Sequence, residues 1–212
     1  MILRNKSKIK GLYLLTDPVL YADKDLFSVI ETAAKNRIDV VQYRDDLIEE
    51  SLFIENAKRI KEILIPYQIP LIISNRIDTV QASGADGIHL ESDYKEVLAA
   101  REKLGEDYII GCSVHFIELI NETNQLPLDY IATGPVFQTS TKQYSHSEWG
   151  IERITEAVQK STHTLVAVGG IHLDNVQKLT ETNIKCLASV SELLKYSSQP
   201  EHLAKFRQVI KS

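Results

Sequence analysis

The chain has 212 residues, of which 43% are hydrophobic and 25% charged, a composition typical of a globular protein. This length suits one domain with a substantial core, so we expect a single domain over residues 1–212, with residues 1–10 as an N-terminal extension. The net charge of −5 argues against nucleic acid as a partner, because proteins that bind nucleic acid usually carry basic excess. The two cysteines, Cys112 and Cys186, exclude a disulfide framework and a cysteine-rich zinc site.

The first residues carry no recognisable targeting signal. Their apolar run, Gly11 to Leu15, is too short for a secretory signal and is followed by Thr16-Asp17-Pro18. No apolar stretch reaches the roughly 20 residues that span a bilayer. We therefore expect a cytoplasmic protein without a membrane partner.

Short apolar runs alternate with amphipathic segments along the chain, as expected for strands buried on both faces that alternate with helices. The expected strands are Leu12–Leu15, Val40–Tyr43, Leu71–Ser74, Gly87–Leu90, Ile109–Cys112, Tyr130–Thr133, Leu165–Val168 and Cys186–Val190. Helical spacing of apolar residues first appears from Leu26 to Ala34 and from Ala57 to Leu64. Further helices are expected at Arg76–Ser83, Asp93–Leu104, Phe116–Thr123, Gly150–Lys160, Leu173–Glu181 and Glu201–Lys211, and one begins at Val190-Ser191.

Eight strand–helix cycles predict the α/β class and a single-domain (β/α)8 TIM barrel, with parallel strands inside a ring of helices. The alternative is an open, doubly wound sheet, because the chain is shorter than the roughly 250 residues typical of the barrel. Asp86 and Asp129 each precede a strand. We interpret both as structural, because that end of a barrel serves stability.

Glycines and serines after the last two strands favour a phosphate site. Gly169-Gly170, expected to open a helix, lets backbone N–H groups approach an anion, and Val190-Ser191 presents a helix N-terminus. The loops after strands seven and eight are the usual phosphate position in a TIM barrel. The alternative is that the glycines only permit a tight turn.

The sixth loop offers three hydroxyls and an ammonium, from Thr139 to Lys142, which suit phosphate or diphosphate oxygens. Residues 143–149 then form either a lid or a solvated connection. Arg44, at the end of the second strand, is either an anion clamp or the partner of Asp45 or Asp46. His115 is either an acid–base group or a structural residue.

Six stretches carry family motifs: residues 12–17 (LYLLTD), 41–44 (VQYR), 84–90 (GADGIHL), 110–115 (IGCSVH), 134–142 (GPVFQTSTK) and 168–171 (VGGI). In this order and spacing the chain resembles the thiamine phosphate synthase and thiazole tautomerase family from about Gly11 to Leu194. The resemblance implies a transferase of thiamin biosynthesis that joins a hydroxymethylpyrimidine diphosphate to a thiazole phosphate and releases diphosphate. Its partners would be these phosphorylated small molecules, with a homodimer as one allowed assembly.

The resemblance also implies roles for individual residues. The thiazole phosphate would bind Thr139, Ser140, Thr141, Gly170, Val190 and Ser191. The pyrimidine diphosphate would bind Gln42, Arg44, Ser113 and Lys142, of which the last three are the expected catalytic residues. Ser74 and Asn75, which end the third strand, complete the expected substrate-binding set.

The chain departs from the family pattern where the resemblance implies Mg²⁺ as the cofactor. Asn75 and Tyr94 occupy the positions of the two magnesium aspartates, and Asp93 is the nearest carboxylate to replace one of them. Mg²⁺ prefers hard anionic oxygens, so these changes should weaken it. Asp46 and Glu91 also replace the family's lysine and glycine, and Asp46 should repel a diphosphate. Two alternatives therefore stand beside the synthase: a metal-independent thiazole-phosphate tautomerase and a non-catalytic protein that binds a phosphorylated ligand.

Overall fold

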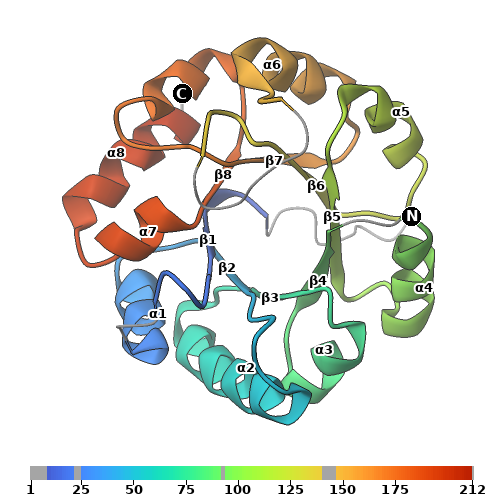
Figure 1. Cartoon of the computed structure of the whole chain (residues 1–212), viewed down its shortest axis with the longest axis vertical. Coiled ribbons are helices and arrows are strands. Elements are labelled where there is room, and N and C mark those ends of the chain that lie inside the picture. The colour runs from blue at the N-terminus through green and yellow to red at the C-terminus, as the bar shows by residue number, and fades with distance from the viewer. Residues whose placement is uncertain (1–8, 22–24, 92–93, 140–146, 212) are drawn as a thin grey trace.

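The computed structural model describes residues 9–21, 25–91, 94–139 and 147–211. Eight parallel strands pair in chain order, and β8 pairs with β1, so that the sheet closes into a barrel (Figure 1). The strands are β1 Gly11–Leu15, β2 Val40–Tyr43, β3 Leu71–Ser74, β4 Gly87–Leu90, β5 Ile109–Val114, β6 Tyr130–Thr133, β7 Thr164–Val168 and β8 Cys186–Ser189. The predicted TIM barrel is confirmed, and the open, doubly wound sheet is excluded.

Helices surround the barrel on the outside (Figure 1). The α-helices are α1 Leu26–Lys35, α2 Glu50–Leu64, α3 Ile77–Ser83, α4 Tyr94–Leu104, α5 Ile120–Thr123, α6 Gly150–Lys160, α7 Ser191–Tyr196 and α8 Pro200–Lys211. Among the described residues, the 3₁₀ helices η2 Ile65–Tyr67, η3 Ile117–Leu119 and η4 Val176–Thr182 complete the ring. The apolar stripe predicted from Leu26 to Ala34 is buried, as helical spacing requires.

Two predicted helices differ from the structure. The helix expected at Leu173–Glu181 is the 3₁₀ helix η4, so Gly169-Gly170 leads into a turn rather than directly into a helix. The Asn175 side chain holds this turn, because it accepts a hydrogen bond from the His172 N–H at 2.8 Å and donates one to the Gly170 carbonyl at 2.7 Å. The helix expected at Phe116–Thr123 divides into η3 and the single turn of α5.

The core has two parts, one between strands and helices and one inside the barrel. Tyr13 and Tyr130 lie in the inner part, whereas Leu12 and Leu14, one residue to either side of Tyr13, pack in the outer part. Gly111 makes room for Tyr130, because a Cβ atom at position 111 would lie 2.1 Å from its ring. The interior is therefore filled by alternate residues of the strands.

The two aspartates that precede strands are structural, as predicted. Asp129 accepts hydrogen bonds from Arg101 and from the Ile110 N–H, each at 2.8 Å. Asp86 accepts from Lys61 at 2.6 Å and from the Leu71 N–H at 2.7 Å. Within the residues described, no helix is long and apolar enough to cross a membrane.

Candidate active site

Two adjoining cavities lie where the strands end, and both are lined by Leu15, Arg44 and Val168. The loop cavity is further lined by Thr139, Gly169, Gly170, Ile171, His172, Ser189, Val190 and Ser191. The barrel cavity is further lined by Tyr13, Gln42, His89, Glu91, Ser113, His115, Tyr130, Ala132, Gly134, Val166 and Ala188. A ligand with two parts could therefore occupy both cavities, with Arg44 between them.

The loop cavity contains the turn and the helix start expected to bind phosphate. Gly170 from the seventh loop, and Val190 and Ser191 from the eighth, line the same space as Thr139 from the sixth. His172 lies there too and makes a hydrogen-bonded contact of 3.1 Å with Glu192. Residues of a turn and of a helix N-terminus thus line one cavity, where an anion site is expected in this fold.

Both glycines of the seventh loop have backbone conformations in which a residue with a Cβ atom would be strained. Gly169 has φ +93° and Gly170 has φ +68°, and a Cβ on Gly170 would lie 2.4 Å from the Phe137 carbonyl oxygen. The sixth loop packs directly on this turn, because the Phe137 N–H donates to the Gly169 carbonyl at 3.1 Å. The glycines therefore serve the packing of two loops as well as access to the loop cavity.

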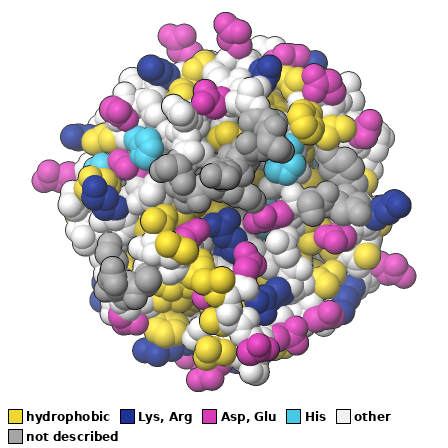
Figure 2. Space-filling view, in the orientation of Figure 1, with side chains coloured by type: hydrophobic (Ala, Val, Ile, Leu, Met, Phe, Trp, Pro, Cys, Tyr) yellow, Lys and Arg dark blue, Asp and Glu magenta, His cyan; other side chains and the backbone are white. Residues whose placement is uncertain are grey.

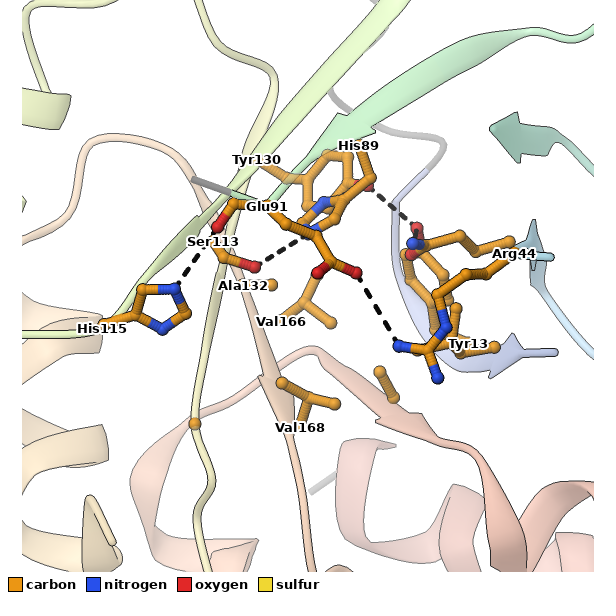
Figure 3. Close-up of a pocket in the computed structure, with 14 residues that line it drawn as sticks. Tyr13, Arg44, His89, Glu91, Ser113, His115, Tyr130, Ala132, Val166 and Val168 are labelled. Atoms are coloured by element: carbon orange, nitrogen blue, oxygen red, sulfur yellow. Dashed lines mark hydrogen bonds and ion pairs between the residues drawn. The ribbon is translucent and has the colours of Figure 1, made fainter. Parts of the chain in front are cut away.

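The barrel cavity is floored by hydrogen-bonded polar side chains (Figure 3). His89 contacts Ser113 through Nε2 and Tyr130 through Nδ1, each at 3.0 Å. Tyr13 donates to Gln42 Oε1 at 2.8 Å and lies 2.9 Å from the Tyr130 hydroxyl. Burial raises the pKa of both phenols well above the usual value, so both stay protonated.

Arg44 is held by the first loop and faces Glu91 (Figure 3). Its guanidinium donates to Asp17 Oδ2 at 2.6 Å, and its backbone N–H donates to Thr16 Oγ1 at 2.9 Å. Nη1 of the same guanidinium lies 3.7 Å from Glu91 Oε1. The alternative stated for Arg44, an ion pair with Asp45 or Asp46, differs from the structure, because its guanidinium pairs with Asp17 and Glu91.

Acidic and basic side chains also lie side by side near the centre of the face shown in Figure 2. Because Asp17 and Glu91 pair with Arg44, any anion that reaches Arg44 must compete with these two carboxylates. Neither Asp17 nor Glu91 was predicted to contact Arg44, because the sequence does not show which loops meet.

The predicted substrate-binding residues divide into three groups. Those that line a cavity are Gln42, Arg44, Ser113, Thr139, Gly170, Val190 and Ser191. Those that lie beside the cavities are Ser74 and Asn75, which do not line either one. Those outside the described residues are Ser140, Thr141 and Lys142, together with Asp93 and residues 143–146 of the predicted lid.

Sequence reasoning did not assign roles to four residues that line the cavities: Tyr13, His89, Tyr130 and His172. The first three occupy inward positions of β1, β4 and β6, so barrel alternation could have identified them. His172 lies two residues after Gly170, and its position could have indicated the loop cavity.

Residues 12–193 match the model of the thiamine monophosphate synthase family. The chain is 37% identical over 202 residues to a thiamine-phosphate synthase of Persephonella marina, a match covering 95% of this chain and 96% of the relative. It is also 37% identical to a thiamine-phosphate synthase of Clostridium tetani, over 91% of both chains. The chain belongs to the thiamine monophosphate synthase family. A thiamine phosphate pyrophosphorylase from Pyrococcus furiosus has the same fold, with a TM-score of 0.84, 24% identity and 98% of both chains covered.

The thiamine monophosphate synthase family implies Mg²⁺, and the described side chains do not fit it. Asn75, at one aspartate position, uses its Oδ1 to accept the Glu91 N–H at 2.9 Å, which ties the third loop to the fourth. The carboxylates of Asp17 and Glu91 are directed at Arg44. Within the described ranges, no group of three or more His, Cys, Asp or Glu side chains could hold a metal ion.

Proposed function

We propose that this chain is a thiamine-phosphate synthase, which joins a hydroxymethylpyrimidine diphosphate to a thiazole phosphate and releases diphosphate. The observation that carries the proposal is the pair of adjoining cavities that share Arg44. Such a reaction needs two phosphorylated ligands side by side, with a cation where the leaving group departs. The relatives' names support this assignment over most of the chain.

The thiazole phosphate would occupy the loop cavity, with its phosphate at the backbone of Gly170, Val190 and Ser191. Thr139 lines the same cavity, and Ser140 and Thr141 follow it in sequence. The thiazole ring would then extend toward the barrel cavity past Val168, which lines both spaces. An amide, a guanidinium and a hydroxyl, from Gln42, Arg44 and Ser113, would surround the pyrimidine and its diphosphate.

In the reaction the bond between the pyrimidine methylene carbon and the diphosphate oxygen breaks, and both electrons leave with diphosphate. The thiazole ring nitrogen then donates its lone pair to the carbon and forms the new C–N bond. Arg44 stabilises the charge that grows on the leaving oxygen, and Lys142 would add a second cation. Ser113 would orient the leaving group, and the cavities hold the two reacting atoms together.

We further propose that the enzyme works in the cytoplasm on small phosphorylated molecules rather than on nucleic acid or a membrane. A homodimer is compatible with this role, since both cavities are lined by residues of one chain.

The assay that tests the proposal incubates purified protein with both phosphorylated substrates and measures diphosphate release and thiamin phosphate, with and without Mg²⁺. Product formation at an ordinary enzyme rate is the expected result. Isomerisation of a thiazole carboxylate phosphate without any coupling would instead indicate a tautomerase, and phosphate binding without turnover would indicate a binding protein. Either result would refute the proposed activity.

Arg44→Gln removes the guanidinium shared by the cavities and should lower kcat/KM by about 10- to 100-fold, the usual effect of a charge-assisted hydrogen bond. Arg37→Gln is the matched control, because Arg37 precedes β2 at the opposite end of the barrel and is exposed. Equal activity of the two variants would show that Arg44 does not contact the leaving group.

A further inference from the structure

A continuous chain of hydrogen bonds crosses the interior of the barrel from β3 to β5. It runs, in order, through Ser74, Gln42, Tyr13, Tyr130, His89 and Ser113. Its five links measure 2.6, 2.8, 2.9, 3.0 and 3.0 Å in that order. All members except Ser113 are buried, and Figure 3 shows the Ser113 end at the barrel cavity.

For a neutral His89, the number of protons fixes the direction of every link. Gln42 Oε1 can only accept, so the single proton of the Tyr13 hydroxyl is given to it. The Tyr130 hydroxyl must then donate to Tyr13, which leaves only its lone pairs for His89. His89 therefore carries its proton on Nδ1, and neutral Nε2 accepts from the Ser113 hydroxyl.

Rotation of the Gln42 side-chain amide by half a turn would reverse every link at once. The amide nitrogen would donate to Tyr13, Tyr13 to Tyr130, and Tyr130 to His89 Nδ1. The His89 proton would then lie on Nε2 and point at Ser113. Mixed arrangements break the chain, because two donors or two lone pairs would meet at one buried link and cost about 1–3 kcal/mol.

We infer that the orientation of the Gln42 amide sets the tautomer of His89 and, through it, the polarity of the Ser113 hydroxyl at the cavity. With Gln42 Oε1 facing Tyr13, the Ser113 proton is directed at His89, so its oxygen offers lone pairs to a ligand N–H group. In the reversed arrangement, the Ser113 hydroxyl donates to a ligand oxygen. Tyr13, Tyr130 and His89 are thus positioning residues, and Gln42 and Ser113 are coupled across the barrel.

The coupling between Gln42 and Ser113 does not depend on the proposed function. Its effect on substrate binding rests on that function. A pyrimidine that binds at Gln42 would decide whether Ser113 can donate to the leaving diphosphate. With Gln42 Oε1 facing Tyr13, the chain favours a ligand donor at Ser113. Binding of the diphosphate at Ser113 would therefore require the reversed arrangement, with the Gln42 amide rotated.

The tautomer of His89 can be measured by ¹⁵N NMR of histidine-labelled protein at about pH 8, where imidazole is neutral. The His89 signals are assigned by their loss in His89→Gln. In the wild type we expect the proton on Nδ1. Tyr13→Phe removes the link between Gln42 and Tyr130 and should release this preference, so that both tautomers appear.

Tyr43→Phe is the matched control, because Tyr43 is equally buried in β2 but bonds to Asn56 outside the chain, at 3.3 Å. It should leave the His89 spectrum unchanged. If Tyr13→Phe does not fold, Tyr130→Phe interrupts the chain one link closer to His89 and should give the same loss of preference. An unchanged His89 tautomer in a folded variant of Tyr13 or Tyr130, or a change in Tyr43→Phe as large as theirs, would overturn the inference. These outcomes are independent of whether the protein makes thiamin phosphate.

Discussion

Replacement of Glu91 by glutamine should strengthen the binding of diphosphate. Glu91 Oε1 lies 3.7 Å from Arg44 Nη1, inside the barrel cavity where the leaving group is expected. Two unit charges at this separation interact by about 4 kcal/mol when the effective dielectric constant is about 20. The carboxylate therefore acts as an internal anion that a diphosphate must displace from Arg44.

The net gain is smaller than this Coulomb energy, because the Glu91 side chain is 26% exposed and solvent screens it. We expect about 1–2 kcal/mol, which corresponds to roughly tenfold tighter binding. Glutamine keeps the shape of the residue and its backbone N–H, so the hydrogen bond to Asn75 that ties the third and fourth loops should persist.

Isothermal titration calorimetry with inorganic diphosphate, at low salt and without Mg²⁺, measures this change. Glu96→Gln is the matched control: it alters the net charge equally but lies exposed on α4. Equal dissociation constants for Glu91→Gln and the wild type, or an equal gain in both variants, would refute the view that Glu91 competes for Arg44.

Three further predictions test other parts of the structure. Gly170→Ala should weaken orthophosphate binding at least tenfold by calorimetry and lower the free energy of unfolding by about 1–3 kcal/mol, since its φ of +68° and its contacts leave no room for a Cβ. Asp129→Asn should destabilise the fold by about 3–5 kcal/mol in urea, because it breaks a buried ion pair with Arg101 of 2.8 Å. Burial raises the pKa of Cys112 to about 12, so at about pH 8 its thiol should resist iodoacetamide until the protein is unfolded.

Most of the fold could be predicted from the sequence, because parallel strands buried on both faces are short and apolar throughout. All eight strands lie within two residues of their predicted bounds, and the longest discrepancy is β5, which continues to Val114. The prediction at Leu173–Glu181 was wrong because the apolar spacing does not reveal the turn that Asn175 holds before η4. Local hydrogen bonds of this kind compete with helix formation, and only the structure shows which prevails.

The sequence predicted which loops form the candidate site, but it did not predict which side chains pair there. Position after a strand end sufficed to place Gly170, Ser191 and Arg44 at the cavities. The partners of Arg44 depend on how the first, second and fourth loops converge, so a motif that ends at residue 44 contains no information about Asp17 or Glu91.

The same reasoning explains why the sequence did not predict the hydrogen-bonded chain inside the barrel. Each member sits in a strand that reads as apolar or mixed, and two of them are tyrosines, which a core accommodates readily. Six residues, each on a different strand from β1 to β6, become one chain only when the barrel closes, because Tyr13 and Tyr130, 117 positions apart, then lie 2.9 Å apart. A family motif can identify Gln42 and Ser113 as separate binding residues, whereas their coupling is a property of the closed barrel. Substitutions at Tyr13 should therefore alter ligand preference at Ser113, although two side chains, Tyr130 and His89, separate them.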